Sequence, residues 1–588
     1  MGRMRIPSSV LHTGAAVSAL ALLVTGCSAG ADGGDEEATA ATASAAVPAG
    51  DPGGHATAEA DAPAGDGVTD DDVEAARKIV ADMSDEELTG SVVMLTYNGT
   101  DVDAAADVIE DRHLAGAIVM GYNLDEGADA DAVGQVTTTL AEAAGERGWP
   151  VAIGVDQEGG PVARLDGAAL DFPPLMAAGA ANDADITRDA IRAQSADLRS
   201  LGFTLNFSPV ADLTIGAEDP VINVRSPGDD PERVSAVVEA AVDGFTSNGL
   251  ASAAKHFPGH GHLTVDSHEE LPVSEESLED LSGDSFEPFR AATEAGVPLT
   301  LVGHIGLPGA EDVPATLNPD VYEALREDVG FEGVAVTDAL NMGAVTEAPG
   351  QETVKAIAAG ADLALMPPDS GDAVEALGQA LESGDLSRER LEEAATRVVA
   401  MQLWQARVGV VGGEDASADD AGNGAGDGAG DSADDAAGED SSDDDAGSGA
   451  GDDAAPDPDD ALSALADASL TVLAGECSFE DPADSVTVVG GSDAARAAFT
   501  TAAEDAGLSV GEGGDVTVSL GETASADVVI GTSGPWRVED AGADTIVEVY
   551  DDNPHALAAA ASYLAGDLDA TGEAPVEVST DAPDCAAD

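Results

Sequence analysis

Four of the nine histidines of this 588-residue chain lie within one short stretch, residues 255–268. The same stretch holds Lys255 and Asp266 and is interrupted by Pro258 and by glycines. It follows an apolar run at 249–254 that is typical of a buried strand, so the titratable side chains begin where a strand ends. Loops on a rigid scaffold are a common place for catalytic groups. We therefore expect acid–base chemistry here; the competing interpretation is a solvated loop without a task.

The elements that must position this loop are short apolar runs that alternate with helical stretches. Each run is almost continuously apolar, which is the pattern of strands buried on both faces of a parallel sheet. Eight such runs over about 340 residues predict an α/β fold, a (β/α)8 TIM-like barrel with insertions. The runs are 91–96, 116–120, 151–155, 203–207, 250–254, 299–302, 333–336 and 361–366, and good helical stretches are 131–147, 187–201, 231–246 and 274–295.

Polar residues stand at the ends of these runs. In a TIM barrel the carboxyl ends of all the strands meet at one rim, where active sites lie. Scattered surface charges would have no reason to favour strand ends. The side chains that we expect on this rim are Asp156, Asp212, Lys255, His256, His304 and Asp338.

These motifs together resemble one known family. Lys255-His-Phe-Pro-Gly-His-Gly, with Asp266-Ser-His268, resembles the signature of glycoside hydrolase family 3, in its β-N-acetylglucosaminidase branch. The resemblance covers roughly residues 70–410. It implies a retaining exo-β-N-acetylglucosaminidase that hydrolyses terminal β-linked GlcNAc without a cofactor. Further blocks of the family are matched, in the expected order, by Asp156-Gln-Glu-Gly-Gly160, Asn206-Phe-Ser-Pro-Val-Ala-Asp212, Asn223-Val-Arg225 and Thr337-Asp-Ala-Leu-Asn-Met-Gly343.

The resemblance implies a catalytic pair. Asp338 would be the nucleophile, because a retaining glycosidase needs a carboxylate that forms an ester with the sugar. His268, held by Asp266, would be the acid/base, since an imidazole titrates near neutral pH. Two purely structural roles stay open. In these, Asp338 is the N-cap of a helix after the seventh strand, and Asp266 caps its own turn.

The resemblance also implies residues that bind the sugar. Asp156 would accept hydrogen bonds from sugar hydroxyls, Arg164 and Arg225 would donate to the sugar and its neighbour, and Lys255 and His256 would bind hydroxyls. A buried lysine at a strand end is costly without a partner, which favours a functional role for Lys255. Arg164 could instead be a surface arginine, because the residues before it depart from the family pattern.

The roles of two further rim residues and of one loop position stay open. Asp212 and His304 are equally consistent with sugar binding and with tying the rim together. The loop reads Gly261-His262-Leu263 where the family more often has Gly-Asp-Thr. This extra histidine leaves the fine substrate preference open.

Competing hypotheses use the same residues differently. A metal-dependent hydrolase could ligate zinc with Asp266 and histidines of this loop, which are His256, His260, His262 and His268. We expect no metal, because such sites normally draw ligands from several strands. Three more hypotheses stay open: a β-glucosidase or β-xylosidase of the same family, a phosphate-using enzyme, and a surface-tethered protein that binds sugar without turnover.

The N-terminal region reads as a targeting segment. Residues 1–27 resemble a lipoprotein signal peptide, because Leu23-Val-Thr-Gly-Cys27 resembles a bacterial lipobox. By that resemblance Cys27 is lipidated and anchors the protein outside the cytoplasmic membrane, where peptidoglycan fragments are the expected substrate. A plain cleaved signal peptide would instead release the protein. Residues 28–68 are a disordered tether, and 69–410 form the catalytic barrel domain.

The C-terminal part is a separate domain. Residues 411–460 are an acidic low-complexity linker, and 461–588 alternate strand-like and helical runs as in a small α/β domain. That domain shows no cluster of titratable residues and no residue that we assign to the active site, so its role stays open. Its Cys477 and Cys585 could form a disulfide outside the cell.

The formal charge of the chain is −93. It excludes nucleic acid as a partner, because phosphate would be repelled. Adaptation to salt and the acidic linkers both account for that charge.

Overall fold

The computed structural model describes residues 67–145, 147–267, 270–345, 347–409, 455–479, 482–521, 526–580 and 582–585. The expected signal peptide with Cys27, nearly all of the expected tether and most of the expected linker lie outside the described residues. His268 lies outside them as well. Within the described part, no helix combines the length and the apolar character that a membrane span requires.

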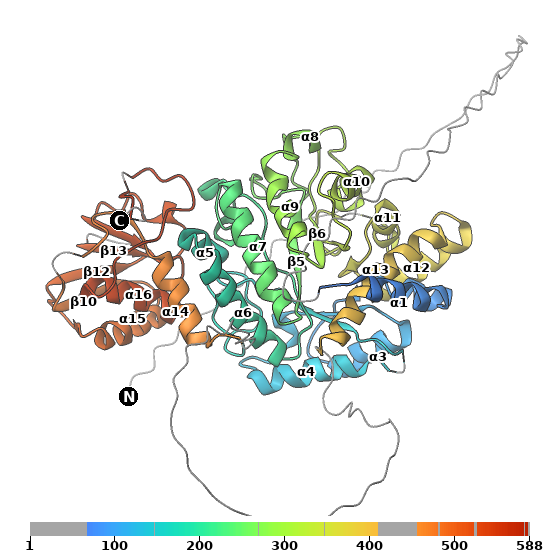
Figure 1. Ribbon diagram of the computed structural model, residues 1–588, viewed down its shortest axis with the longest axis horizontal. Coiled ribbons are helices and arrows are strands. Elements are labelled where there is room, and N and C mark those ends of the chain that lie inside the picture. Colours follow the sequence, from blue (N-terminus) through green and yellow to red (C-terminus); the bar gives the residue numbers. More distant parts are fainter. Residues whose placement is uncertain are drawn as a thin grey trace, which may run out of the picture. The chain divides into compact units, whose positions relative to one another are not determined.

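Eight parallel strands form a sheet that curls into a barrel (Figure 1). They pair in the order β7-β6-β5-β4-β3-β2-β1-β8, and a parallel bridge from Val336 to Leu363 brings β7 beside β8. Every strand residue is buried, as the continuous apolar runs predict. The predicted fold class is thereby confirmed. The strands are β1 (Val93–Leu95), β2 (Gly116–Val119), β3 (Ala152–Val155), β4 (Leu205–Asn206), β5 (Ala251–Phe257), β6 (Leu299–Val302), β7 (Val334–Thr337) and β8 (Ala364–Leu365).

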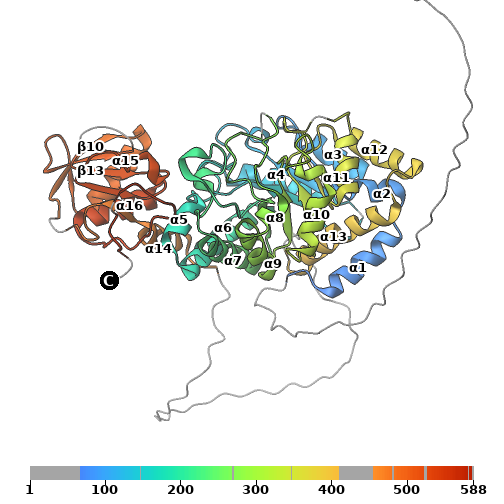
Figure 2. The same ribbon diagram turned by 90° about the horizontal axis from the view of Figure 1, so that it is seen from above.

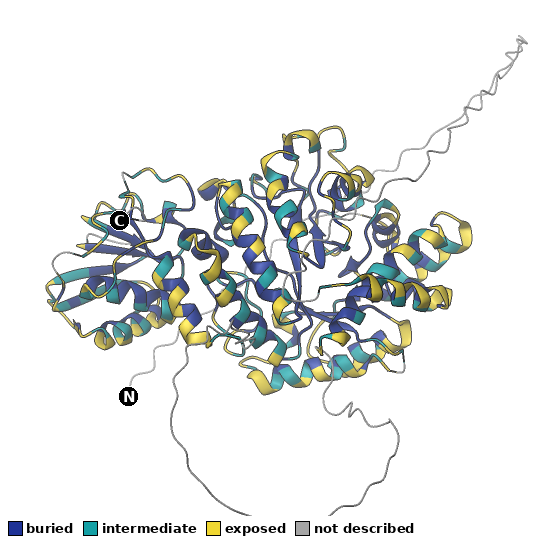
Figure 3. Ribbon diagram, viewed as in Figure 1, coloured by how far each residue is buried: buried dark blue, intermediate teal, exposed yellow. Residues whose placement is uncertain are grey.

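Helices surround the barrel, with their buried sides towards it and their exposed sides outwards (Figure 3). The last helix of the barrel domain, α13, and its first, α1, pack side by side (Figures 1 and 2). The helices are α1 (Asp70–Ala81), α2 (Asp85–Gly90), α3 (Val102–Arg112), α4 (Ala130–Glu142), α5 (Leu175–Ala181), α6 (Ala184–Ser200), α7 (Pro231–Ser247), α8 (Leu278–Leu281), α9 (Glu287–Glu294), α10 (Pro319–Glu327), α11 (Gln351–Ala359), α12 (Ser370–Ser383) and α13 (Arg388–Arg407).

One expected helix is broken in the structure. The composition of 274–295 predicts a single helix, but the stretch forms α8, a 3₁₀ turn and α9. Ser277 caps α8 through a reciprocal hydrogen-bonded box, and α9 starts with Pro288 in its first turn. Proline lacks the N–H that a continuing helix would need, so the prediction is wrong about continuity.

The barrel interior is filled by apolar side chains of the strands and by one helix. Met94, Phe207 and Val336 belong to one buried cluster with Trp404 of α13. Gln402 and Gln405 of α13 donate to backbone carbonyls that precede β2 and β4, at 2.7 Å and 2.5 Å. Helix α13 therefore closes the amino end of the barrel and leaves the carboxyl rim for the site.

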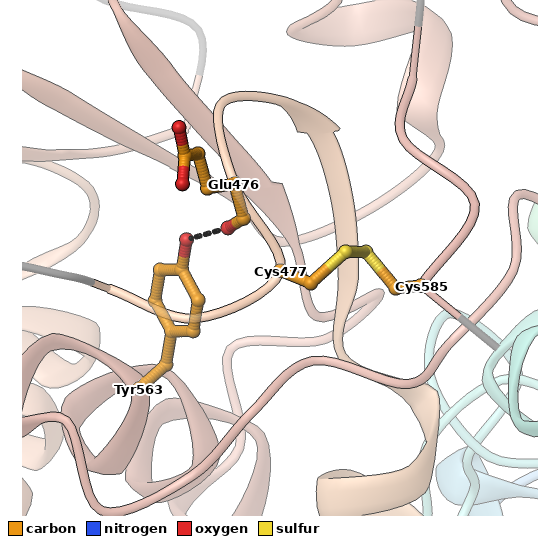
Figure 4. Close-up of a disulfide and its surroundings, with 4 residues drawn as sticks. All are labelled: Glu476, Cys477, Tyr563 and Cys585. Atoms are coloured by element: carbon orange, nitrogen blue, oxygen red, sulfur yellow. Dashed lines mark hydrogen bonds between the residues drawn. A yellow bond between two sulfur atoms is a disulfide. The ribbon is translucent and has the colours of Figure 1, made fainter. Parts of the chain in front are cut away.

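The C-terminal domain is a second α/β sheet. Its strands follow the order β11-β10-β12-β13-β14-β9, and only β9 runs antiparallel to its neighbour. The structure joins Cys477 and Cys585 by a disulfide, beside the hydrogen bond from Tyr563 to the carbonyl of Glu476 (Figure 4). The elements are α14 (Pro458–Ser469), β9 (Thr471–Ala474), β10 (Ser485–Gly490), α15 (Asp493–Asp505), β11 (Ser509–Val510), β12 (Val516–Leu520), β13 (Val528–Gly531), β14 (Thr545–Glu548) and α16 (Pro554–Ala565).

The two domains contact each other directly. Helix α14 packs against α5 and α6 of the barrel domain. Arg233 of α7 donates to the carbonyl of Gly179 at 2.6 Å and to the carboxylate of Glu573 at 2.7 Å. The backbone of Glu573 in turn donates to the carbonyl of Ala180 at 2.9 Å. These contacts hold the C-terminal domain against α5, α6 and α7 of the barrel domain.

Candidate active site

Asp338 lies directly after β7, on the carboxyl rim. Its N–H donates to the carbonyl of Val302 at 2.9 Å, and its Oδ1 accepts the N–H of Ala339 at 2.7 Å. Burial alone would raise the pKa of this carboxyl. Nearby His304 and His256, the Ala339 amide and Lys255 outweigh burial and hold the pKa below its ordinary value. Asp338 is therefore an ionised carboxylate at neutral pH, as a nucleophile must be.

The helix-cap role for Asp338 is wrong. Among the described residues between β7 and α11, no helix begins at Asp338. His304 instead fixes this turn. Its Nδ1 lies 2.6 Å from Thr316 Oγ1 and its Nε2 lies 2.9 Å from the carbonyl of Ala339. His304 thus has a positioning contact on each ring nitrogen.

A cluster of two carboxylates and two cations lies on the same rim, with Lys255 and Glu158 buried and Asp156 and Arg225 partly buried. Lys255 Nζ is 2.8 Å from Asp156 Oδ1 and 2.6 Å from Glu158 Oε1. Arg225 reaches Glu158 with two parallel hydrogen bonds of 2.8 Å each. Burial lowers the pKa of Lys255, but Asp156 and Glu158 raise it more, so the net shift is upwards. Lys255 remains charged and can donate to a sugar hydroxyl.

Glu158 is a site residue that the sequence analysis missed. It lies within the quoted motif 156–160 and is only 3% exposed. Burial raises its pKa, but Arg225 and Lys255 more than offset this and keep the pKa well below the ordinary value. The missed signal was an acidic residue shortly after a buried strand, which needs a cation to offset its burial.

Asp212 links His256 of β5 to His260 of the loop that follows. Its Oδ2 lies 2.7 Å from His256 Nδ1 and accepts the N–H of His256 at 3.0 Å, and its Oδ1 accepts the N–H of His260 at 2.6 Å. Both of its oxygens are therefore bound to protein groups. Asp212 ties the rim together, which was one of the two roles left open for it. His256 Nε2 lies 3.5 Å from Arg225 and so borders the charged cluster.

Arg164 joins the site less closely. The side chain of Gln157 accepts the backbone N–H of Arg164 at 2.8 Å, which fixes that loop beside β3. The guanidinium is partly exposed, and its buried Nε has no hydrogen-bond partner in the described part of the chain. The structure thus brings together Asp156, Arg225, Lys255, His256 and Asp338, and leaves the role of Arg164 as a prediction.

The predicted dyad is described only in part. Asp266 lines a cavity of about 1080 Å³ together with Arg225 and Asn223, while His268 lies outside the described residues. The pairing of Asp266 with His268 therefore stays a prediction.

The remaining histidines of the loop have protein neighbours. His260 faces Ser267, and His262 lies 3.5 Å from Glu276. Among the described residues, no group of three or more His, Cys, Asp or Glu is arranged to hold a metal ion.

The cavity beside Arg225 has a second wall from the C-terminal domain. Ser533, Trp536, Tyr550 and Asp551 line it together with Arg225. Burial, with Asp171 nearby, raises the pKa of Asp551 to about 7. The sequence left the role of residues 461–588 open, and the structure places some of them at this cavity. Sequence patterns could not reveal this, because these residues and Arg225 are more than 300 positions apart and meet only in the folded chain.

Comparison with known proteins identifies the family of the barrel domain. Residues 85–401 match the glycosyl hydrolase family 3 N-terminal domain. Beta-hexosaminidase LpqI of Mycobacterium tuberculosis is 31% identical over 325 residues, which are 53% of this chain and 81% of that protein. Beta-hexosaminidase A of Pseudoalteromonas piscicida is 30% identical over 326 residues, 50% of this chain, and the match spans only 54% of that relative.

A solved structure resembles both domains. The glycoside hydrolase family 3 beta-N-acetylglucosaminidase from Paenibacillus sp. str. FPU-7 superposes with a TM-score of 0.70 at 27% identity, covering 85% of this chain and 99% of that one. The matched region, the barrel and the rim motifs agree with one another. We conclude that the chain belongs to glycosyl hydrolase family 3, a family of glycoside hydrolases.

Proposed function

We propose that the protein is a retaining exo-β-N-acetylglucosaminidase that removes terminal, non-reducing β-linked GlcNAc. The observation that carries this proposal is the placement of Asp338 directly after β7, on the same rim as the cluster of Lys255, Arg225, Asp156 and Glu158. The names of the related beta-hexosaminidases and of the similar beta-N-acetylglucosaminidase structure support the choice of sugar.

Asp338 attacks the anomeric carbon and forms a glycosyl ester as the bond to the leaving oxygen breaks. His268, with Asp266 as its partner, gives its proton to that oxygen and then takes a proton from the water that cleaves the ester. Lys255 and His256 hold sugar hydroxyls, so that the anomeric carbon faces Asp338. Each step uses groups of this chain and needs no cofactor.

The test uses the full chain and a chromogenic β-GlcNAc glycoside beside its β-glucoside analogue. We expect turnover of the first, with the β-anomer as the initial product in an NMR time course. Asp338→Asn should abolish turnover, while Asp111→Asn, an exposed position on α3, should leave it unchanged. Normal activity of the Asp338 variant would remove the nucleophile assignment, and preference for the glucoside would favour a β-glucosidase.

The natural substrate and place of action are part of the proposal. The lipobox-like Cys27 supports an anchor outside the cytoplasmic membrane, and that location makes peptidoglycan fragments the expected source of terminal GlcNAc. Release of GlcNAc from purified muropeptides, with and without phosphate, tests substrate and acceptor together. Appearance of GlcNAc-1-phosphate would show phosphorolysis instead of hydrolysis. Cys27→Ser should move the protein from the membrane fraction to the medium.

A further inference from the structure

His260 is a buried side chain of the loop after β5 that the proposed mechanism does not use. It is 2% exposed, and its ring centroid lies 5.9 Å from that of His256. Its Nε2 lies 3.1 Å from Ser267 Oγ, whereas its Nδ1 is buried and has no hydrogen-bond partner in the described ranges. Within the described ranges, Ser267 is therefore the one hydrogen-bond partner of this imidazole ring.

The imidazole of His260 is neutral at physiological pH. Burial, together with the neighbouring His256, lowers its pKa to about 4. A neutral imidazole shares one hydrogen bond with a serine hydroxyl whichever of the two groups is the donor. His260 therefore acts here as a fixed hydrogen-bonding group and not as a charge.

The backbone of His260 is anchored as firmly as its side chain. Its N–H donates to Asp212 Oδ1 at 2.6 Å, and Oδ2 of the same carboxylate holds His256. At the next position, a side chain on Gly261 would meet the carbonyl oxygen of Leu213 at 1.6 Å, so the loop lies directly on the Asp212–Leu213 backbone. This end of the loop is thus fixed relative to the sugar-binding histidine.

The other end of the hydrogen bond is Ser267, which directly follows Asp266. A bond from a rigidly held imidazole to Ser267 restricts where the Asp266 backbone can lie. We propose that His260 is a positioning residue, and that its hydrogen bond to Ser267 fixes the Asp266–Ser267 segment relative to His256 and so aligns proton donation to the leaving group. This inference rests on the proposed function, because it concerns how the predicted acid/base partner Asp266 is held.

The position of a general acid matters most where the leaving group needs its proton. A 2,4-dinitrophenolate leaves without protonation, whereas a phenolate of high pKa requires it. Loss of alignment should therefore slow a phenyl β-GlcNAc glycoside and spare the dinitrophenyl one. A merely structural role would slow both equally, through the amount of folded enzyme.

The experiment measures kcat/KM on these two glycosides with the full chain. Ser267→Ala is expected to lose about tenfold or more on the phenyl glycoside, since a positioned acid contributes about 10²–10⁴-fold, with little loss on the dinitrophenyl glycoside. His260→Gln, whose amide can still reach Ser267, should keep more phenyl activity than Ser267→Ala. The double variant with His260→Gln and Ser267→Ala should lose little more phenyl activity than Ser267→Ala alone, because both substitutions affect the same hydrogen bond. Ser282→Ala, whose hydroxyl bonds only within its own helical turn, is the matched control.

Three outcomes separate this inference from the proposed function. Equal losses of Ser267→Ala on both glycosides, or no loss, would overturn the positioning role. If Asp266→Asn shows the dependence on leaving group while Ser267→Ala does not, the proposed function stands and only the role of His260 fails. If the unaltered protein turns over neither glycoside, the proposed function fails first.

Discussion

Removing the charge of Glu158 tests the electrostatic account of the site. Glu158→Gln keeps the size of the side chain but removes the carboxylate that pairs with both Lys255 and the partly buried Arg225, and leaves Asp156 paired with Lys255. Breaking a buried ion pair from one side costs about 3–5 kcal/mol. Because glutamine retains an acceptor oxygen, we expect the lower limit, about 3 kcal/mol of unfolding free energy, and a fall in Tm of roughly 5 °C or more.

The assay is denaturant unfolding at several pH values, with Glu323→Gln, an exposed position on α10, as control. The pKa of Glu158 is depressed in the folded state, so its stabilising effect is complete above the ordinary pKa of about 4.3 and is lost as pH falls towards the folded value. The difference in unfolding free energy between the unaltered protein and the variant should therefore be constant near neutral pH and shrink below about pH 4. KM should also rise, because Glu158 orients both cations. A difference below about 0.5 kcal/mol at pH 7 would refute this reasoning.

Two further predictions concern the scaffold. Replacing Cys477 and Cys585 by serine opens a loop of 108 residues and should destabilise the C-terminal domain by about 4 kcal/mol, measured as its unfolding midpoint; an unchanged midpoint would mean that the bridge contributes nothing. Gly179→Ala in α5 would bring a methyl group within 1.7 Å of the Pro227 carbonyl oxygen and should cost about 1–3 kcal/mol. A methyl group added at Gly378 in α12 would meet no atom within 4 Å beyond the neighbouring backbone of its own helix, so Gly378→Ala should instead stabilise by about 0.5–1 kcal/mol. Equal effects at the two glycines would contradict the packing argument.

The barrel could be predicted because its signal is repeated. Eight buried strands each need a continuous apolar run, and the helices between them need caps and amphipathic faces, so local patterns report the architecture directly. The prediction failed where two local signals conflicted, as in 274–295, where helical composition continues across a proline and a glycine. The carboxyl ends of the predicted strands then placed Asp156, Lys255 and Asp338 on one rim.

The sequence by itself determined the fold class, the family motifs and the types of side chain at the rim. Each of these is specified by residues that lie next to one another in the chain. The tertiary structure alone decided which charges share a site. Glu158, Arg225 and Lys255 come from three different loops and strands, and their pKa shifts exist only because folding removes water and brings the charged atoms of Glu158 within 2.8 Å of Arg225 and 2.6 Å of Lys255. The C-terminal wall of the cavity, with Trp536, arises for the same reason: it depends on the packing of two domains, which no local pattern encodes.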